Sequence, residues 1–201
     1  MQNTPTRQIR AIYDDSTIRV YQAYNDHIAN SALDKGTFVS PPFKMERMTW
    51  IKPSFLWMMY RSGWAQKDEG QNRILAIDIS RVGFEWALAH GLGSKRPPEA
   101  KSREDWEAMK KTMPVRIQWD PERNLNLEPL SHRAIQIGLT REAVKLYCNE
   151  WITRITDVTE LSKEIHELVL SGDTDSATSL LPGESPYPIE RALAEALGIS
   201  D

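Results

Sequence analysis

Strand-like and helix-like segments alternate along most of this chain, and their order is the strongest constraint on its fold. Residue composition and period-two alternation predict strands over residues 17–24, 47–53, 73–79, 114–120 and 132–139. Helical spacing of apolar side chains predicts helices over residues 26–36, 54–64, 80–91, 140–172 and 189–201, and the region 140–172 could be broken near Thr156–Asp157. Polar segments that contain proline predict loops at 93–112, with room for one helical turn, and at 171–188. This order predicts an α+β domain with a mixed or antiparallel sheet.

The length of 201 residues suits a single domain, with a core over about 7–158 and a helical, acidic extension over 159–201. The charge is unevenly spread. Residues 1–67 hold nine Lys and Arg against five Asp and Glu, whereas residues 150–201 hold three against eleven. A net charge of −3 argues against a general nucleic-acid binder. The basic N-terminal third could still attract an anionic ligand.

Several classes are excluded by what the sequence lacks. The single cysteine, Cys148, permits neither an intrachain disulfide nor a cysteine-based zinc site, and the four histidines are not spaced for a metal, so no metal site is expected. GxGxxG and P-loop motifs are absent. The apolar runs are too short to span a membrane and the N-terminus has no apolar signal core. We therefore expect a cytoplasmic protein without a membrane partner.

The segment from Arg47 to Trp64, RMTWIKPSFLWMMYRSGW, is unusually rich in aromatic and cationic side chains. Its aromatic residues have the spacing of a core-facing helix. Its polar members permit two interpretations, and they are Arg47, Lys52, Tyr60, Arg61 and Ser62. Cations beside aromatic planes can hold a phosphate while a flat ring stacks, which suits a nucleotide. Alternatively, these side chains only surround an aromatic cluster with their charged ends in water.

The strand predicted at 17–24 and the segment after 119 supply further candidates. Arg19 points to one face of that strand, and Gln22 and Tyr24 point to the other, where they could line the mouth of a pocket. Arg10 and Arg19 could instead form surface ion pairs with Asp14 and Asp15. The candidates for a catalytic carboxylate, or for an amide in its place, are Asp120, Glu122, Glu128, Gln136 and Glu142.

Five segments together resemble the DUF4291 family, which is defined only as a domain of unknown function. They are RQIRAIYDDSTIRVYQAYN, RMTWIKPSFLWMMYRSGW, ILAIDISRVGFEWAL, RIQWDPERNLNLEPL and RAIQIGL. The resemblance extends from about Arg7 to Val158, and the tryptophan-rich segment is its longest and most specific part. The family itself implies no activity.

The segment VYQAYNDHIANSALDKGTFV is similar in layout to the opening of ADP-ribosyltransferase-like domains. That resemblance implies a split, mostly antiparallel sheet flanked by helices, with NAD held in its cleft. It implies a His or Arg on the first strand, a Ser or aromatic residue in a middle motif, and a Glu on a late strand. In this sequence the positions are Gln22 or Arg19, then Ser54, Tyr60 or Ser62, and finally Gln136.

Two of these positions depart from the family pattern, since Gln22 stands where His is usual and Gln136 where Glu is usual. An amide stabilises positive charge on a ribose poorly, so the domain either transfers ADP-ribose by another scheme or only binds. The leading hypothesis places NAD with its phosphates on Arg47, Lys52 and Arg61. Its rings would stack on Tyr24, Trp50 and Tyr60, while Gln22, Tyr60 and Gln136 would act on the ribose bond.

In that hypothesis, ADP-ribose passes to an unknown acceptor, which could be protein, nucleic acid or a small molecule. Two alternatives remain open. The basic, aromatic N-terminal third could bind RNA or single-stranded nucleic acid without catalysis. The chain could instead be an interaction protein whose tryptophan cluster is only core.

Overall fold

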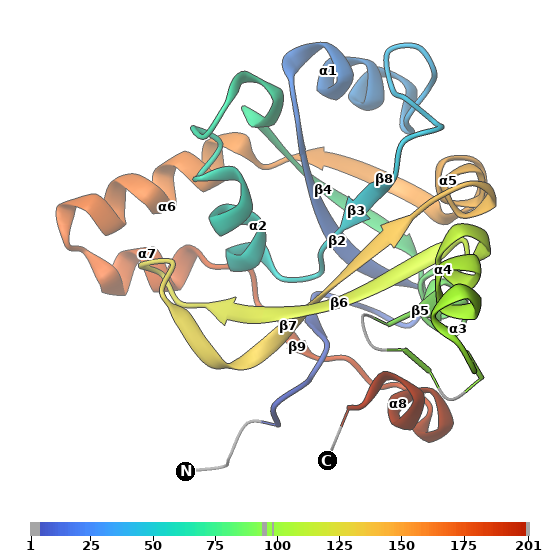
Figure 1. The fold of residues 1–201 in the computed structure, drawn as a ribbon. Helices are drawn as coiled ribbons and strands as arrows, with labels where there is room; N and C mark the ends of the chain where they lie inside the picture. The colour runs from blue at the N-terminus through green and yellow to red at the C-terminus, as the bar shows by residue number, and fades with distance from the viewer. Residues whose placement is uncertain (1–4, 94–95, 98, 200–201) are drawn as a thin grey trace.

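The computed structural model describes residues 5–93, 96–97 and 99–199. Its strands form a three-stranded sheet, a four-stranded sheet and a short two-stranded ribbon (Figure 1). The strands are β1 (Arg10–Ala11), β2 (Thr17–Tyr24), β3 (Thr49–Ile51), β4 (Arg73–Ser80), β5 (Gly91–Leu92), β6 (Val115–Arg123), β7 (Pro129–Leu139), β8 (Ile152–Asp157) and β9 (Ser185–Pro186).

The helices lie around these sheets, and α6 and α7 pack side by side (Figure 1). They are α1 (Asp26–Lys35), α2 (Phe55–Ser62), η1 (Glu69–Gln71), α3 (Arg81–Ala89), α4 (Arg103–Thr112), α5 (Glu142–Leu146), the π-helix η2 (Tyr147–Trp151), α6 (Thr159–Ser171), α7 (Thr174–Leu180) and α8 (Arg191–Leu197). The predicted α+β class and the predominance of antiparallel strands are confirmed.

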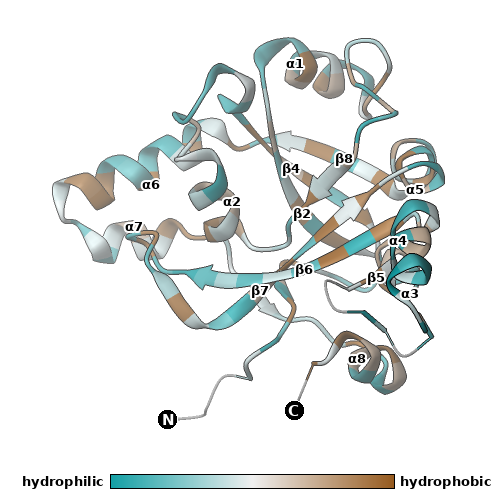
Figure 2. Ribbon diagram, viewed as in Figure 1, coloured by the Kyte–Doolittle hydropathy of each residue, from teal (hydrophilic) through white to brown (hydrophobic). Residues whose placement is uncertain are grey.

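The three-stranded sheet, in the order β2-β4-β8, is buried on both faces. Alternate residues of β4 enter different apolar clusters, because neighbouring side chains on a strand point to opposite faces. Leu75 and Ile77 join the larger cluster, and Ile74 and Ala76 join the smaller one. This double burial explains the nearly continuous apolar run of β4, and the central strands accordingly show brown bands in Figure 2.

The larger cluster also receives apolar side chains from the four-stranded sheet, ordered β3-β7-β6-β5, including Ile117 and Ile137. The two sheets meet at one point. The backbone N–H of Tyr21 on β2 donates to the carbonyl of Lys52 over 2.7 Å, and the N–H of Lys52 donates back over 3.3 Å. This reciprocal pair joins the end of β3 to the middle of β2 and sets where the sheets diverge.

The helix predicted over 54–64 is present as α2, and its ends follow the expected chemistry. The Ser54 side chain caps its N-terminus by accepting from the N–H of Trp57 over 3.1 Å. Gly63 ends it in the left-handed region at φ 57°. The buried face of α2, with Phe55, Met58 and Met59, packs into the smaller apolar cluster.

The helical region predicted over 140–172 is broken near Thr156–Asp157, but by the whole strand β8, which the prediction did not include. Four of the six residues of β8 are β-branched, which favours an extended backbone, and β4 offers an edge for antiparallel pairing. The predicted loops are also partly wrong, since α7 lies in one and the ten-residue α4 in the other. Ser102 and Asp105 form a capping box that begins α4, which is largely teal in Figure 2 and has no buried residues.

Candidate functional site

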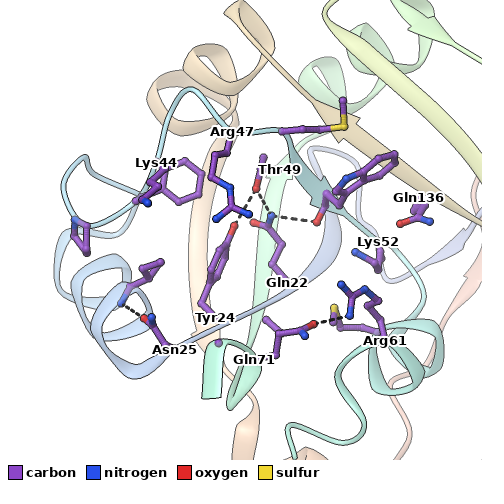
Figure 3. A pocket seen from close by; sticks show the side chains of 18 of the residues that line it. Gln22, Tyr24, Asn25, Lys44, Arg47, Thr49, Lys52, Arg61, Gln71 and Gln136 are labelled. Atoms are coloured by element: carbon purple, nitrogen blue, oxygen red, sulfur yellow. Dashed lines mark hydrogen bonds between the residues drawn. The ribbon is translucent and has the colours of Figure 1, made fainter. Parts of the chain in front are cut away.

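A cavity of about 730 Å³ opens beside the junction of the two sheets. Side chains from the end of β2, the segment that leads into β3, and helix α2 surround it (Figure 3). The predicted site residues that line it are Gln22, Tyr24, Arg47, Trp50, Lys52, Arg61 and Gln136. Its volume lies in the range of roughly 300–1,000 Å³ that is usual for small-ligand sites.

A buried hydrogen-bond network forms the inner wall of the cavity around Gln22, which is 3 % exposed. The Gln22 amide donates to Thr49 Oγ1 over 2.9 Å and to the carbonyl of Trp50 over 3.2 Å. Its oxygen accepts from the Tyr147 hydroxyl over 2.7 Å. The Tyr24 hydroxyl lies 2.9 Å from Thr49 Oγ1, and burial raises the pKa of Tyr24 and of Tyr147, so both keep their protons. Gln22 therefore holds β2 against β3 with both ends of its amide.

The lining of the cavity is cationic. It includes Lys44, Arg47, Lys52 and Arg61, and no Asp or Glu is among the described residues that line it. A concave wall with one sign of charge focuses its potential on the space inside. The arrangement therefore favours an anionic ligand.

Lys52 follows β3 directly and is only 5 % exposed. Burial and, to a smaller extent, the nearby charge of Arg61 lower its pKa to about 7, although the charge of Asp120 acts in the opposite direction. In the part of the chain that the structure describes, Lys52 makes no side-chain hydrogen bond or salt bridge. In Figure 3 its side chain lies between those of Gln136 and Arg61.

The two arginines of the cavity approach it from different elements. Arg61, in the last turn of α2, donates to Gln71 Oε1 over 3.2 Å and stays exposed to solvent. Arg47, in the segment before β3, points toward Tyr24 and Gln22 in Figure 3. Both guanidinium groups therefore keep donors available for a ligand.

Gln136 on β7 lies at the other side of the cavity and is tied to the neighbouring strand β6. Its amide donates to Gln118 Oε1 over 3.0 Å and to Asp120 Oδ2 over 2.6 Å. Asp120 does not line the cavity but is hydrogen-bonded to Gln136, which does, so its charge is close enough to act on Lys52. The Gln136 amide oxygen is the end that a ligand hydroxyl could approach.

Arg19 does not line the cavity. Its guanidinium forms a two-point ion pair with Asp78 on the adjacent strand β4, over 2.7 and 2.9 Å. The predicted pairing of Arg19 with Asp14 or Asp15 is therefore wrong, because β4 places a carboxylate directly opposite. Asp14 instead accepts from the backbone N–H groups of Ser16 and Thr17 in a turn.

Ser54, Tyr60 and Ser62 also lie outside the cavity lining, although they belong to the same segment as Lys52 and Arg61. The Ser54 hydroxyl caps α2 and donates to Glu122 Oε1 over 2.9 Å. Ser62 is fully buried and donates to the carbonyl of Met58 over 2.9 Å. Tyr60 faces outward, with the Arg123 guanidinium 3.6 Å from the centre of its ring.

The structure adds lining residues that the sequence analysis did not single out, among them His27, Lys44, Thr49, Gln71 and Gln118. Lys44 and Thr49 flank Arg47 in the sequence, and Gln118 is the cross-strand partner of Gln136. Strand pairing was the signal that could have located Gln118, since residues opposite each other on neighbouring strands lie side by side.

Burial raises the pKa of the Cys148 thiol to about 12, so this residue behaves as an apolar core side chain. Within the described residues no cluster of three or more His, Cys, Asp or Glu side chains is arranged to hold a metal ion. No helix in that same part of the chain has both the length and the apolar character needed to cross a membrane.

The fold and the site define a split-sheet α+β domain with a cation-lined cavity where its two sheets meet. Residues 8–187 match the family model described as a domain of unknown function (DUF4291), and the chain belongs to that family. The match continues beyond Val158, where the resemblance was expected to end, and includes α6, α7 and β9. A search of curated proteins finds no match.

Proposed function

We propose that the cavity binds a nucleotide of the NAD type and that the protein is an ADP-ribosyltransferase-like transferase. It would cleave the bond between nicotinamide and ribose and pass ADP-ribose to an acceptor. The observation that carries the proposal is a cavity of about 730 Å³ between two diverging sheets, whose lining, among the described residues, is cationic and without a carboxylate. A dinucleotide needs both this volume and this charge.

The phosphates would be bound by Arg47, Lys44 and Arg61, which approach the cavity from two separate segments. Guanidinium groups bind phosphate oxygens through two parallel hydrogen bonds, and a lysine adds a point charge. Because Arg61 makes one hydrogen bond, to Gln71, its remaining donors can face a ligand.

The indole of Trp50 would be the stacking surface for a base or for nicotinamide. Trp50 pairs with Gly138 on β7, and a Cβ added at Gly138 would come within 3.0 Å of the indole. Glycine at this position therefore lets the indole lie close against the backbone of β7. Tyr24 is less suited to stacking, because its ring packs against Phe38 and Phe43, with centroid distances of 5.1 and 6.0 Å.

Gln136 would orient the ribose, and Asp120 supports it in that role. The Asp120 carboxylate accepts from the Gln136 amide over 2.6 Å and polarises it, which makes the amide oxygen a better acceptor for a sugar hydroxyl. In ADP-ribosyltransferase-like domains a glutamate is usual at the position of Gln136. Here the negative charge is on Asp120, which is hydrogen-bonded to Gln136. Gln22 would shape the wall rather than react, since its amide is engaged at both ends.

The test is to titrate the protein with NAD, ADP-ribose and ATP, while recording thermal shift and the release of nicotinamide from NAD. Binding should weaken in Arg47→Ala and Arg61→Ala. It should be unchanged in Arg154→Ala, which removes an exposed arginine on β8 outside the cavity. No thermal shift with any nucleotide and no nicotinamide would leave the interaction-protein alternative in its place.

A second candidate function, binding of RNA or single-stranded nucleic acid, is favoured by a second basic hollow of about 640 Å³. Its cationic residues are Lys110, Lys111, Arg116, Arg141 and Lys145, with Glu46 as the acid among the described residues that line it. Met48 lines both hollows, so the two cationic surfaces adjoin. A phosphate backbone could follow such a track while Trp50 stacks on a base.

Filter binding of a short single-stranded RNA across a range of salt concentrations tests this candidate. Affinity should fall steeply with salt, and Arg116→Ala with Arg141→Ala should reduce that slope, because fewer counterions are released. An affinity that is absent or independent of salt would remove this candidate.

A further inference from the structure

Lys52 is held in place more firmly than a surface lysine. Its backbone is bonded to Tyr21 in both directions, over 2.7 and 3.3 Å, at the junction of the sheets. Pro53 and the helix cap Ser54 follow at once, so the chain cannot shift locally without disturbing α2. The amine is therefore presented to the cavity from a rigid position, which suits a reacting group.

The amine lacks the ion pair that two half-buried arginines of this protein have. Arg19 pairs with Asp78 over 2.7 Å and Arg73 pairs with Asp26 over 2.8 Å. Lys52 has no such ion pair among the described residues, although it is more deeply buried than either arginine. A structural cation would need a counter-charge, because an unpaired buried charge is costly. The Lys52 amine therefore loses its proton more readily than the amine of an exposed lysine.

The cationic side chains around Lys52 also favour the neutral form of its amine. Arg61 on α2 disfavours a second positive charge, and Asp120 on β6 is separated from the cavity by the Gln136 amide. Lys44 and Arg47 on the segment before β3, and His27 on α1, also line the cavity. With burial as the largest cause, the pKa of Lys52 falls to about 7, so a large fraction of the amine is neutral near neutral pH. A desolvated lysine beside another cation is a recurrent form of activated amine nucleophile.

We propose that Lys52 is a catalytic nucleophile that forms an imine with the carbonyl carbon of a phosphorylated aldehyde bound in this cavity. Under the proposed function, on which this choice of ligand rests, the aldehyde is the open form of the terminal ribose in ADP-ribose. The reactivity of Lys52 toward phosphorylated aldehydes in general does not depend on NAD cleavage.

The step is balanced without an oxidant or a metal. The neutral Lys52 amine attacks the carbonyl carbon through its lone pair and the carbon–oxygen π bond breaks. The nitrogen then gives up one proton while the oxygen takes one up, which gives a carbinolamine. The hydroxyl leaves with the second nitrogen proton as water, and the carbon–nitrogen double bond forms, so amine and aldehyde become imine and water. Arg47 and Lys44 would bind the phosphate, and Arg61 would donate to the developing oxygen.

Reductive trapping tests the proposal. The full-length protein is mixed with ADP-ribose, or with pyridoxal 5′-phosphate as a general phosphorylated aldehyde, and sodium cyanoborohydride is added. Intact mass and peptide mapping should show one dominant adduct on Lys52, whose formation rises with pH around the value of about 7 given above. Pyridoxal without its phosphate should react at least tenfold more slowly, because the cationic lining selects an anion.

Lys52→Met should lose the dominant adduct and still fold, since it places an apolar chain of similar length in a buried position. Lys101→Met, at an exposed lysine outside the cavity, should label as the wild type does. Mapping of the wild-type adduct needs no variant and stands if Lys52→Met is unstable. Labelling spread over exposed lysines without preference for Lys52, or unchanged in Lys52→Met, would overturn the proposal.

Nicotinamide release, measured on the same samples, separates this inference from the proposed function. An adduct on Lys52 without NAD cleavage supports the imine-forming lysine and removes the transferase. NAD cleavage at equal rates in wild type and Lys52→Met, with no adduct, retains the transferase and removes the lysine nucleophile.

Discussion

Three ionisable side chains near the start of helix α2, Glu122, Glu184 and Lys52, differ in their hydrogen-bond partners. At its N-terminus, Glu184 accepts from the N–H of Phe55 over 2.7 Å, and Glu122 accepts from Ser54 and from the N–H of Arg123. Lys52, which precedes the same helix in the chain, faces Arg61 across the cavity and has no side-chain hydrogen-bond partner in the described residues. Glu184 satisfies a free N–H at the positive end of α2, and Glu122 accepts from the serine that caps it, so both acids have a structural task. The amine has no such task, and that contrast marks the cavity as the functional region.

The comparison is tested most strongly by the pH dependence of stability at Lys52. Its pKa falls from 10.5 to about 7 on folding, so between these values the unfolded chain binds a proton that the folded chain does not. Unfolding free energy should therefore rise with pH across this window, by at most about 1.4 kcal/mol per pH unit. Urea denaturation of wild type and Lys52→Met at several pH values would measure it, and the variant should lose the slope. Equal slopes in the two proteins would mean that the amine is paired in solution.

Glu184 should give a smaller effect of opposite sign. Burial and the charge of Glu122 raise the pKa of Glu184 from 4.5 to about 8, so the folded chain keeps a proton that the unfolded chain releases in this window. Stability should fall as pH rises through it, by less than about 1.4 kcal/mol per pH unit, because the residue is only half-buried and its carboxylate retains the Phe55 N–H.

Glu184→Gln keeps an oxygen for the Phe55 N–H and removes the titration. The same denaturation series should show a flatter profile on the acid side for this variant. Glu190→Gln, at an exposed glutamate nearby in the sequence, is the matched control and should behave as wild type. A profile that Glu184→Gln leaves unaltered would show that folding does not shift the pKa of Glu184.

Arg61→Ala separates ligand binding from stability. Loss of one charged donor to phosphate should weaken nucleotide binding by about tenfold or more, which corresponds to about 1.4 kcal/mol. Stability should change by less than about 0.5 kcal/mol, because the side chain is exposed and makes one hydrogen bond. Calorimetric titration with NAD measures the first and thermal unfolding the second. Comparable losses in Arg154→Ala would indicate a nonspecific charge effect.

The smallest effect is expected at Tyr60, a predicted site residue that lies outside the cavity. Tyr60→Leu removes the contact in which Arg123 lies 3.6 Å from the ring centre, and should cost about 0.5–1 kcal/mol of stability. Nucleotide affinity should stay the same. If affinity fell as far as it does in Arg61→Ala, Tyr60 would belong to the binding site after all.

Local patterns identified α2 well and β8 poorly, for a physical reason. Ser54 and Gly63 act within their own turn of chain, so the ends of α2 can be predicted from neighbouring residues. Strand β8 is stabilised by pairing with β4, which lies far earlier in the chain, and its two isoleucines, Ile152 and Ile155, are only half-buried and do not alternate. A short segment with such a weak pattern takes its structure from its partner strand.

The candidate site, like the fold, was predictable from local sequence only in part. The tryptophan-rich segment alone indicates that Arg47, Lys52 and Arg61 lie near one another, since one short segment contains all three. It gives no means of separating Lys52, which faces the cavity, from Ser62, which is fully buried in hydrogen bonds to its own helix. Exposure and partners depend on what packs against each side chain.

Residue order and chemistry alone determined the α+β class, the ends of α2 and the cationic character of the N-terminal third, because these depend on short-range periodicity, capping and composition. Only the tertiary structure decided that Gln22, Lys52 and Gln136 would share one cavity and that Arg19 would face Asp78 instead. Those outcomes depend on the bonds between Tyr21 and Lys52 and on the register of β6 with β7, which join residues far apart in the chain. Such pairings form only when the sheets pack, and no local pattern encodes them.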